Sequence, residues 1–140
     1  MSTGGELHEL AGLRVTVDRV VYAPGMEAPP DRPHSFVYFI TIHNDSTVAV
    51  TIKGRKWVVR ESDGETIAVE GDGVVGQFPT ILPAASFSYQ SRHLLAGGAA
   101  VAEGSYLGVD ANGRRVVVRI PAFGMQVPPG SAGRRAGLDD

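Results

Sequence analysis

The fold class can first be tested on Val69-Glu70-Gly71-Asp72-Gly73-Val74-Val75-Gly76, which contains the pattern G-x-G-x-x-G. In a dinucleotide-binding α/β fold, this pattern follows a strand, opens a helix and is followed by an acidic residue about 20 positions later. Here Pro79 and Pro83 follow, and prolines remove helical hydrogen-bond donors and clash with the preceding turn. The residues at the ribose-binding distance are Gln90 to His93, so the carboxylate is missing as well. The stretch therefore argues against a nucleotide-binding α/β fold.

The composition is that of one soluble domain of 140 residues, with 43% hydrophobic residues, 18 glycines and 9 prolines. A formal net charge of −2 argues against a dedicated nucleic-acid or membrane-surface protein. The absence of cysteine excludes disulfides, thiolate nucleophiles and cysteine metal sites. Residues 1–6 lack the basic start and apolar run of a secretory signal, and no apolar run is long enough to span a membrane. We therefore expect a cytoplasmic location.

Alternating apolar residues predict strands along most of the chain. The pattern begins at Leu13, and Ser35–Ile42 is almost continuously apolar and β-branched or aromatic, as expected of a central strand covered on both sides. Between them, Ala23–Pro33 contains too many prolines and glycines for regular structure and predicts a long surface loop. The charged run Lys53–Lys56 is expected to interrupt the following strand before Trp57.

Two dipeptides that end in glycine predict β-hairpins. Asp63-Gly64 and Asn112-Gly113 are preferred pairs for two-residue type I′ turns. The second turn, as a two-residue loop, predicts one shared face for four apolar residues and an exposed ion pair across the strands. The predicted pairs are Val109 with Val116, Leu107 with Val118, and Asp110 with Arg115.

Seven to eight such strands with no helical period predict an all-β fold, an antiparallel sandwich, with a small barrel as the alternative. Residues 1–12 are interpreted as a flexible leader, 13–128 as the folded domain and 129–140 as a disordered tail.

Five segments in a shared order carry a resemblance to the ApaG family. These are Gly54-Arg55-Lys56-Trp57, Glu70–Gly76, Pro79 to Ser91, Gly104-Ser105-Tyr106 and Ile120-Pro121-Ala122-Phe123. The resemblance implies an immunoglobulin-like, fibronectin type III-like β-sandwich and little about chemistry. The sequence departs from the family pattern at four positions, with Phe78 in place of Gln, Ala84 and Arg92 in place of Gly, and Ala102 in place of Met.

An anion-binding site is one interpretation of the glycine stretch. Glycines allow consecutive backbone N–H groups to converge on a phosphate, and basic residues lie on the preceding strand. The candidate residues are Arg55, Lys56, Gly71, Gly73 and Gly76. The alternative is that the glycines only permit a strained crossover between two sheets, because Glu70 and Asp72 place negative charge where a phosphate would lie.

No arrangement of residues indicates catalysis or metal binding. Trp57 is interpreted as a core residue rather than a stacking platform for single-stranded nucleic acid. The spacing of His34, His43 and His93 fits no known metal site, and Ser91 and His93 share a strand face without a nucleophile elbow. Glu61 and the neighbouring carboxylates are expected to be solvated.

The sequence therefore favours a non-enzymatic protein-binding module without a cofactor or metal, whose protein partner it does not identify. The alternative is binding of a small anion or nucleotide polyphosphate, such as pyrophosphate, at Gly71–Gly76. The ApaG resemblance links this alternative to divalent-cation homeostasis. Nucleic-acid binding is not favoured, and no membrane partner is expected.

Overall fold

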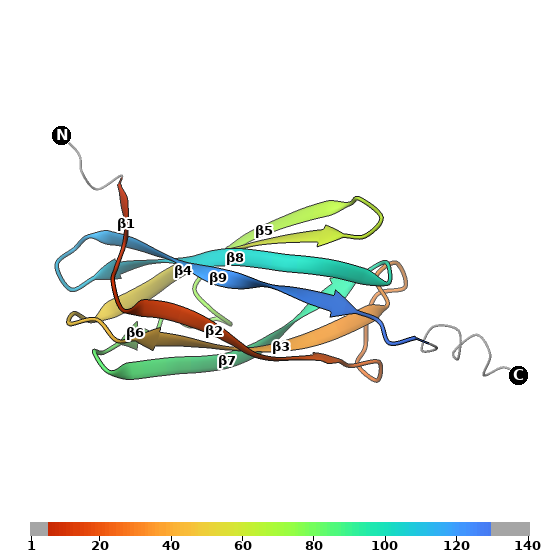
Figure 1. Cartoon of the computed structure of the whole chain (residues 1–140), viewed down its shortest axis with the longest axis horizontal. Coiled ribbons are helices and arrows are strands. Elements are labelled where there is room, and N and C mark those ends of the chain that lie inside the picture. The colour runs from red at the N-terminus through yellow and green to blue at the C-terminus, as the bar shows by residue number, and fades with distance from the viewer. Residues whose placement is uncertain (1–5, 130–140) are drawn as a thin grey trace, which may run out of the picture.

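The computed structural model describes residues 6–129, and they form nine β-strands (Figure 1). The strands are β1 (Leu7–Glu9), β2 (Leu13–Tyr22), β3 (His34–Asn44), β4 (Val50–Glu61), β5 (Thr66–Asp72), β6 (Thr80–Ile81), β7 (Ala85–Leu95), β8 (Ala99–Asp110) and β9 (Arg115–Gln126). The described residues contain no helix, so none that could cross a membrane. The predicted long loop at Ala23–Pro33 is confirmed as the connection between β2 and β3.

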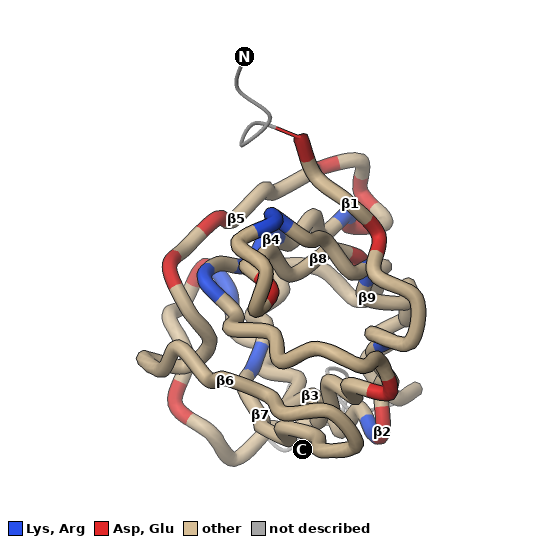
Figure 2. The backbone as a smooth tube through the Cα atoms, turned by 90° about the vertical axis from the view of Figure 1, so that its left-hand side faces the viewer, with Lys and Arg blue, Asp and Glu red and all other residues tan. Residues whose placement is uncertain are grey.

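The strands form two sheets packed face to face, as Figure 2 shows. The large sheet has the order β1-β9-β8-β4-β5, with β6 also paired to β4, and the small sheet has the order β2-β3-β7. All pairs are antiparallel except β1 with β9. The predicted β-sandwich is therefore confirmed, and the alternative of a small barrel is wrong. The count is nine rather than seven to eight because β1 and β6 have only three and two residues, too few for an alternation to be visible.

The core lies between the sheets. Strand β3 is central in the small sheet, as predicted, but its outer face is not covered as expected, since Val37 and Phe39 are only partly buried. Phe36, Tyr38, Ile40 and Ile42 all project inward from β3, the central strand of the small sheet. Trp57 is 2% exposed, which confirms it as a core residue. The other fully enclosed large side chains include Tyr106, Ile52, Leu95 and Met125.

Strand β4 is continuous, contrary to the expected interruption at Lys53–Lys56. The pairing with β8 shifts between Ile52 and Gly54, so Lys53 occupies a β-bulge. The extra residue changes which side chains point inward, and Arg55 then shares the inner face with Trp57 while Lys56 lies on the outer face. A bulge therefore accommodates the charged run without ending the strand.

The predicted register of the last hairpin is wrong by one residue. The loop has three residues, because the N–H of Asp110 donates to the carbonyl of Arg114 at 2.9 Å and that of Gly113 donates to Asp110. The Asp110 carboxylate accepts the N–H groups of Asn112 and Arg114, each at 2.9 Å, which fixes the turn and lowers the pKa of Asp110.

A one-residue slip reverses the two faces of a strand. Val116 therefore lies opposite Gly108 and Val118 opposite Tyr106, while Leu107 and Val109 face outward. The expected pair of Asp110 with Arg115 is replaced by one with Arg114. The first hairpin has the same three-residue loop, since Glu61 pairs with Glu65 and Gly64 donates to Glu61, so the two-residue turn predicted there is also corrected.

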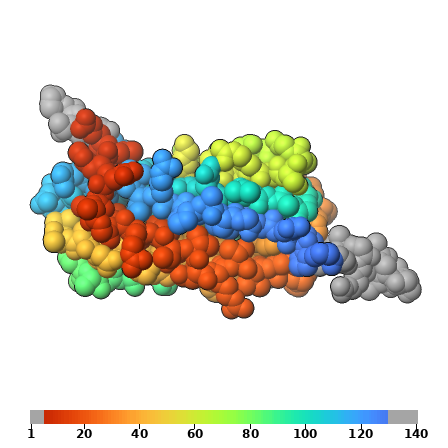
Figure 3. Space-filling view, in the orientation of Figure 1, coloured from red at the N-terminus to blue at the C-terminus, as the bar shows by residue number. Residues whose placement is uncertain are grey.

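Strand β1 lies inside the segment expected to be a flexible leader. Leu7 to Glu9 pair in parallel with Arg115 to Val117 of β9, so regular structure begins before Leu13. Figure 3 shows the first described residues lying against β9. The predicted disordered tail falls almost wholly outside the described residues, and the domain boundaries stay predictions.

Candidate binding groove

The glycine stretch forms the end of β5 and a tight turn. Arg55 pairs with Gly71 in the ladder, and its guanidinium donates to the carbonyls of Asp72 at 2.9 Å and Gly73 at 3.2 Å. A Cβ at Gly71 would lie 2.7 Å from this guanidinium, a contact that a shift of the flexible arginine side chain would relieve. The structure therefore brings Arg55, Gly71 and Gly73 together. Lys56 lies on the opposite face, 3.8 Å from Glu70.

Two N–H groups expected to face a phosphate are hydrogen-bonded within the chain. The N–H of Gly73 donates to Lys53 at 2.8 Å, and that of Val74 donates to Gln77 at 2.8 Å. Val75 and Gly76 between them have φ angles of 48° and 79°, which are the positive values of a type I′ turn. Val74 is fully buried. The loop is therefore stabilised by hydrogen bonds within the chain, and the Arg55 guanidinium donates to two of its carbonyls.

Two hollows adjoin this loop, one on each face of the large sheet. The outer one has a volume of about 590 Å³ and is lined by Lys53, Lys56 and Arg115 together with the acidic Glu70 and Asp72. The inner one has a volume of about 290 Å³ and opens between β5 and β7. We call this inner hollow the β5–β7 groove. Its lining residues are Arg32, Tyr38, Arg55, Trp57, Val59, Ile67, Val69, Ser91, Arg92, His93 and Leu94.

The groove exists because β5 extends past the small sheet. Ile67 and Val69 pair with Val59 and Trp57 and so share the inner face of the large sheet with them. Val59 and Trp57 are buried, whereas Val69 is 42% exposed and no residue of β5 is buried. No strand of the small sheet covers the inner face of β5 in the described chain, because that sheet ends at β7. The result is an apolar surface above a free strand edge.

Aromatic side chains form the floor of the groove. The His93 ring lies 4.7 Å from the Tyr38 and Trp57 rings and stacks on Phe123 at 6.3 Å, measured between ring centroids. Burial lowers the pKa of His93 to about 4, so its ring is neutral at pH 7. Within residues 6–129, His93 Nε2 and Trp57 Nε1 are buried without a hydrogen-bond partner. The floor is thus aromatic and contains two unpaired ring nitrogens.

Tyrosine hydroxyls lie deeper between the sheets. The hydroxyls of Tyr89 and Tyr106 are hydrogen-bonded to each other, and burial raises the pKa of both. Burial also raises the pKa of Tyr38, while hydrogen bonds with Ser91 and Tyr89 and the charge of Arg55 lower it. The Arg55 charge therefore acts between the sheets, at the groove. The Ser91 hydroxyl interacts with Tyr38, which gives it no base and does not make it a nucleophile.

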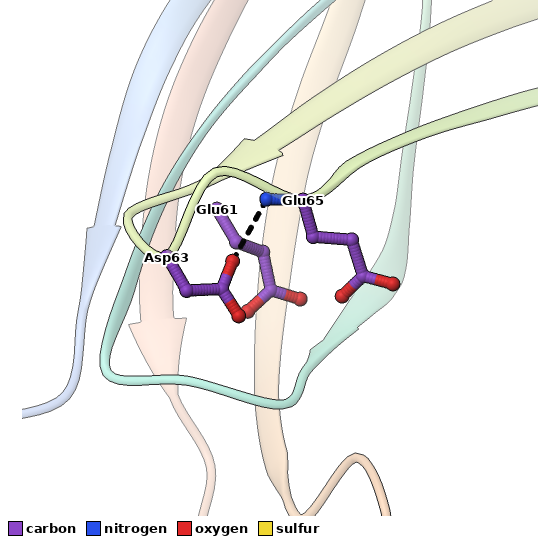
Figure 4. A group of neighbouring side chains, drawn as sticks. All are labelled: Glu61, Asp63 and Glu65. Atoms are coloured by element: carbon purple, nitrogen blue, oxygen red, sulfur yellow. Dashed lines mark hydrogen bonds between the residues drawn. The ribbon is translucent and has the colours of Figure 1, made fainter.

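The predicted solvation of Glu61 is wrong, as its side chain is 0% exposed. It accepts the Arg32 guanidinium at 2.9 Å and the N–H groups of Ala96 and Gly97 at 3.2 and 2.8 Å. Glu61, Asp63 and Glu65 form the acidic cluster of Figure 4, the single group of three potential metal ligands among residues 6–129. Because the Glu61 carboxylate is satisfied by chain donors, the cluster is explained by its role in joining loops. Sequence reasoning missed it because its partners are 29 and more residues away.

The other histidines also have local explanations. His34 lies 3.0 Å from the Tyr22 hydroxyl, and His43 lies 2.9 Å from that of Thr16. They lie on β3, His34 near the loop that precedes it and His43 on the outer face of the small sheet, away from the groove.

Comparison with known proteins gives consistent results. The family model described as the ApaG domain matches residues 24–110. Protein ApaG of Shewanella pealeana is 39% identical over 115 residues, which cover 81% of this chain and 91% of the relative. Protein ApaG of Chromohalobacter salexigens is 40% identical over 76% of this chain and 85% of its own length.

Solved structures agree with the sequence relatives. A structural-genomics target determined by X-ray crystallography superposes with a TM-score of 0.77 at 30% identity, over 85% of this chain and 89% of that one. A protein from Bordetella pertussis, described as a putative ApaA protein, has a TM-score of 0.74 at 26% identity, over 89% of this chain and 99% of that one. With the β-sandwich and the matched segments in agreement, the chain belongs to the ApaG domain family.

Proposed function

We propose that this protein is a non-enzymatic, cytoplasmic protein-binding module and that its partner docks in the β5–β7 groove. The observation that supports the proposal is the uncovered inner face of β5, where Ile67 and Val69 line a hollow of about 290 Å³. Burial of such a surface by a partner is favourable because it removes apolar area from water.

The chemistry of the groove supports recognition rather than catalysis. Its histidine is neutral and enclosed by aromatic rings, and its tyrosine has a raised pKa. The Ser91 hydroxyl has a tyrosine rather than a base as its neighbour. These groups give the groove shape and polarity but no nucleophile with an adjacent base.

A random-peptide selection tests the proposal. Peptides of about 12 residues displayed on phage are selected on the wild-type protein, since an extended segment of that length spans the groove. Selected peptides are then synthesised, and their dissociation constants are measured by fluorescence anisotropy. Val69→Asn should weaken binding at least about tenfold, because an asparagine replaces an apolar contact by an uncharged amide that the partner would have to desolvate.

Val101→Asn is the matched control. Val101 is 46% exposed, against 42% for Val69, and it lies on the outer face of the same sheet. We expect it to leave the dissociation constants unchanged. The proposal fails if no peptide is enriched, or if selected peptides bind the two asparagine variants equally well.

Anion binding is a second candidate, and the outer hollow of about 590 Å³ favours it. Four basic residues, Lys53, Arg55, Lys56 and Arg115, line that hollow beside Gly71. Thermal melts with pyrophosphate, with and without magnesium, test it. A ligand at about 100 times its dissociation constant adds roughly 2.7 kcal/mol to the stability of the folded state. Lys53→Ala should abolish the shift, and an unchanged melting temperature at millimolar pyrophosphate removes this candidate.

A further inference from the structure

We infer that the β5–β7 groove takes an extended, acidic segment of a partner protein, which adds to the free edge of β7 as a fourth strand of the small sheet. This inference rests on the proposed function, since it specifies the chemistry of the partner that the groove binds.

The edge of β7 differs from the edges at β9 and β2. In β9, Pro121 lacks an N–H group and β1 covers the first residues, and in β2 a bulge at Asp18 shifts the register. Both devices hinder strand addition. Strand β7 pairs with β3 over eleven residues without a register shift and contains no proline. Arg92 is its one charged residue. Its outer edge is therefore a regular template for a further strand.

A strand added to β7 would lie beneath β5. The large sheet has β5 next to β4, whereas the small sheet stops at β7, so the vacant position in the small sheet faces the inner side of β5. Alternate side chains of the added strand would point toward Ile67 and Val69. The segment should therefore carry apolar residues at the inward positions that face Ile67 and Val69. The Leu94 carbonyl already accepts Arg32 at 3.2 Å, which limits the addition to the residues before it.

The charges that line the groove are all positive. Arg32, Arg55 and Arg92 line it, and no carboxylate of the described part of the chain does. Arg32 is neutralised by Glu61 and Glu65, at 2.9 and 3.2 Å.

The other two arginines have no ion-pair partner among the described residues. Arg55 donates to backbone carbonyls, and Arg92 donates to the carbonyl of Glu27 at 2.7 Å and the hydroxyl of Ser35 at 3.4 Å. Their positive charges therefore remain uncompensated, and an incoming carboxylate would be attracted to them.

Because side chains alternate between the two faces of a strand, Arg55 and Arg92 would meet different positions of the added strand. Arg55 lies on the inner face of the large sheet, so it would meet a carboxylate directed into the sandwich. Arg92 is exposed on the outer face of the small sheet, so a carboxylate one residue further along the added strand would lie across from it. Because His93 is neutral at pH 7, the arginines alone supply the positive charge. An acidic and apolar strand matches both sets of contacts.

Peptide variants test the inference directly. The selected peptides should be rich in Asp or Glu, and Glu→Gln changes in them should weaken binding roughly three- to tenfold, with a larger loss for Glu→Lys. Arg92→Glu should weaken the acidic peptide and strengthen its Glu→Lys form. Arg119→Glu, on the exposed outer face of β9, is the charge-matched control and should change neither affinity. A thermal melt of each variant establishes that it is folded.

Amide hydrogen exchange tests the mode of binding. A bound peptide should slow the exchange of alternate amides between Tyr89 and His93, whose N–H groups point outward from the edge. Peptides that depend on Val69 but bind equally well as Glu, Gln and Lys forms would overturn the inference and leave the proposed function standing. Peptides that ignore Val69 would instead overturn the proposed function.

Discussion

His93 should make the fold less stable as the pH falls from 6.5 to about 4. In the folded chain its ring lies among Tyr38, Trp57 and Phe123, and burial lowers its pKa from 6.5 to about 4. In the unfolded chain the ring is in water and binds a proton near pH 6.5. Between these two values the unfolded state binds more protons, so the free energy of unfolding decreases as the pH is lowered.

The size of the effect follows from the two pKa values. Full protonation of the unfolded state against a neutral folded state amounts to about 3 kcal/mol, and at pH 5 the loss is about 2 kcal/mol. The variant His93→Phe keeps an aromatic ring against Tyr38 and Phe123 but cannot titrate. Other groups that titrate in this range are common to both proteins and cancel in the difference.

Urea denaturation at pH 7 and pH 5 measures this difference. Trp57 is the single tryptophan and is buried, so its fluorescence reports unfolding. Wild type should lose about 2 kcal/mol more than His93→Phe between the two pH values. Equal losses in the two proteins would refute the reasoning, because they would mean that His93 is protonated as easily in the folded state as in the unfolded state.

Three further changes have predictable effects on stability, all measurable by urea denaturation. Gly73→Ala should destabilise far more than Gly76→Ala, although both residues have positive φ, because a Cβ at Gly73 would lie 2.4 Å from the Gln77 carbonyl oxygen. A Cβ at Gly76 meets nothing within 4 Å, so that variant should lose only the backbone strain of about 1–2 kcal/mol, and similar losses in the two variants would contradict this account. Ala84→Gly should stabilise by about 1 kcal/mol, because Ala84 has a φ of 71°, and a destabilised variant would show that this strain is absent. Glu61→Gln should cost about 3 kcal/mol, because the enclosed Glu61 side chain loses its charged bonds to Arg32 and to the N–H of Gly97. Glu103→Gln at the exposed pair with Arg60 should cost under about 1 kcal/mol, and equal costs would argue against the burial of Glu61.

Local patterns predicted the layers of the fold. The apolar run of β3 and the core position of Trp57 follow from side-chain periodicity, which depends on near neighbours in the sequence. The turns were located correctly, but their lengths were not. In the last hairpin, the Asp110 carboxylate selects a three-residue loop, and this choice reverses the faces of Leu107 and Val109.

The candidate groove could not be predicted in the same way. It depends on β5 extending beyond β7, two strands in different sheets that do not pair. The glycine stretch drew attention to Arg55 and Gly71, which do lie together. No pattern within the stretch indicated that the arginine would point between the sheets, because the bulge at Lys53 determines its direction.

The departure from the family pattern at Ala84 has a structural meaning. Glycine is usual there in the resemblance described above, and the residue adopts a left-handed φ of 71°. The turn before β7 therefore forms despite the alanine, with the N–H of Ala84 donating to Asn44 at 2.7 Å. A strained residue is tolerated where the surrounding hydrogen bonds determine the backbone.

Strand β1 affects how this protein is expected to aggregate during storage. It is held by three residue pairs, so its detachment costs much less free energy than unfolding of the sandwich. Detachment uncovers the backbone of Arg115 to Val117, and two uncovered copies could then join through these edges. The rate of aggregation should therefore follow the frequency of this small opening. A variant with an unchanged melting temperature but a weaker β1 would have a shorter shelf life.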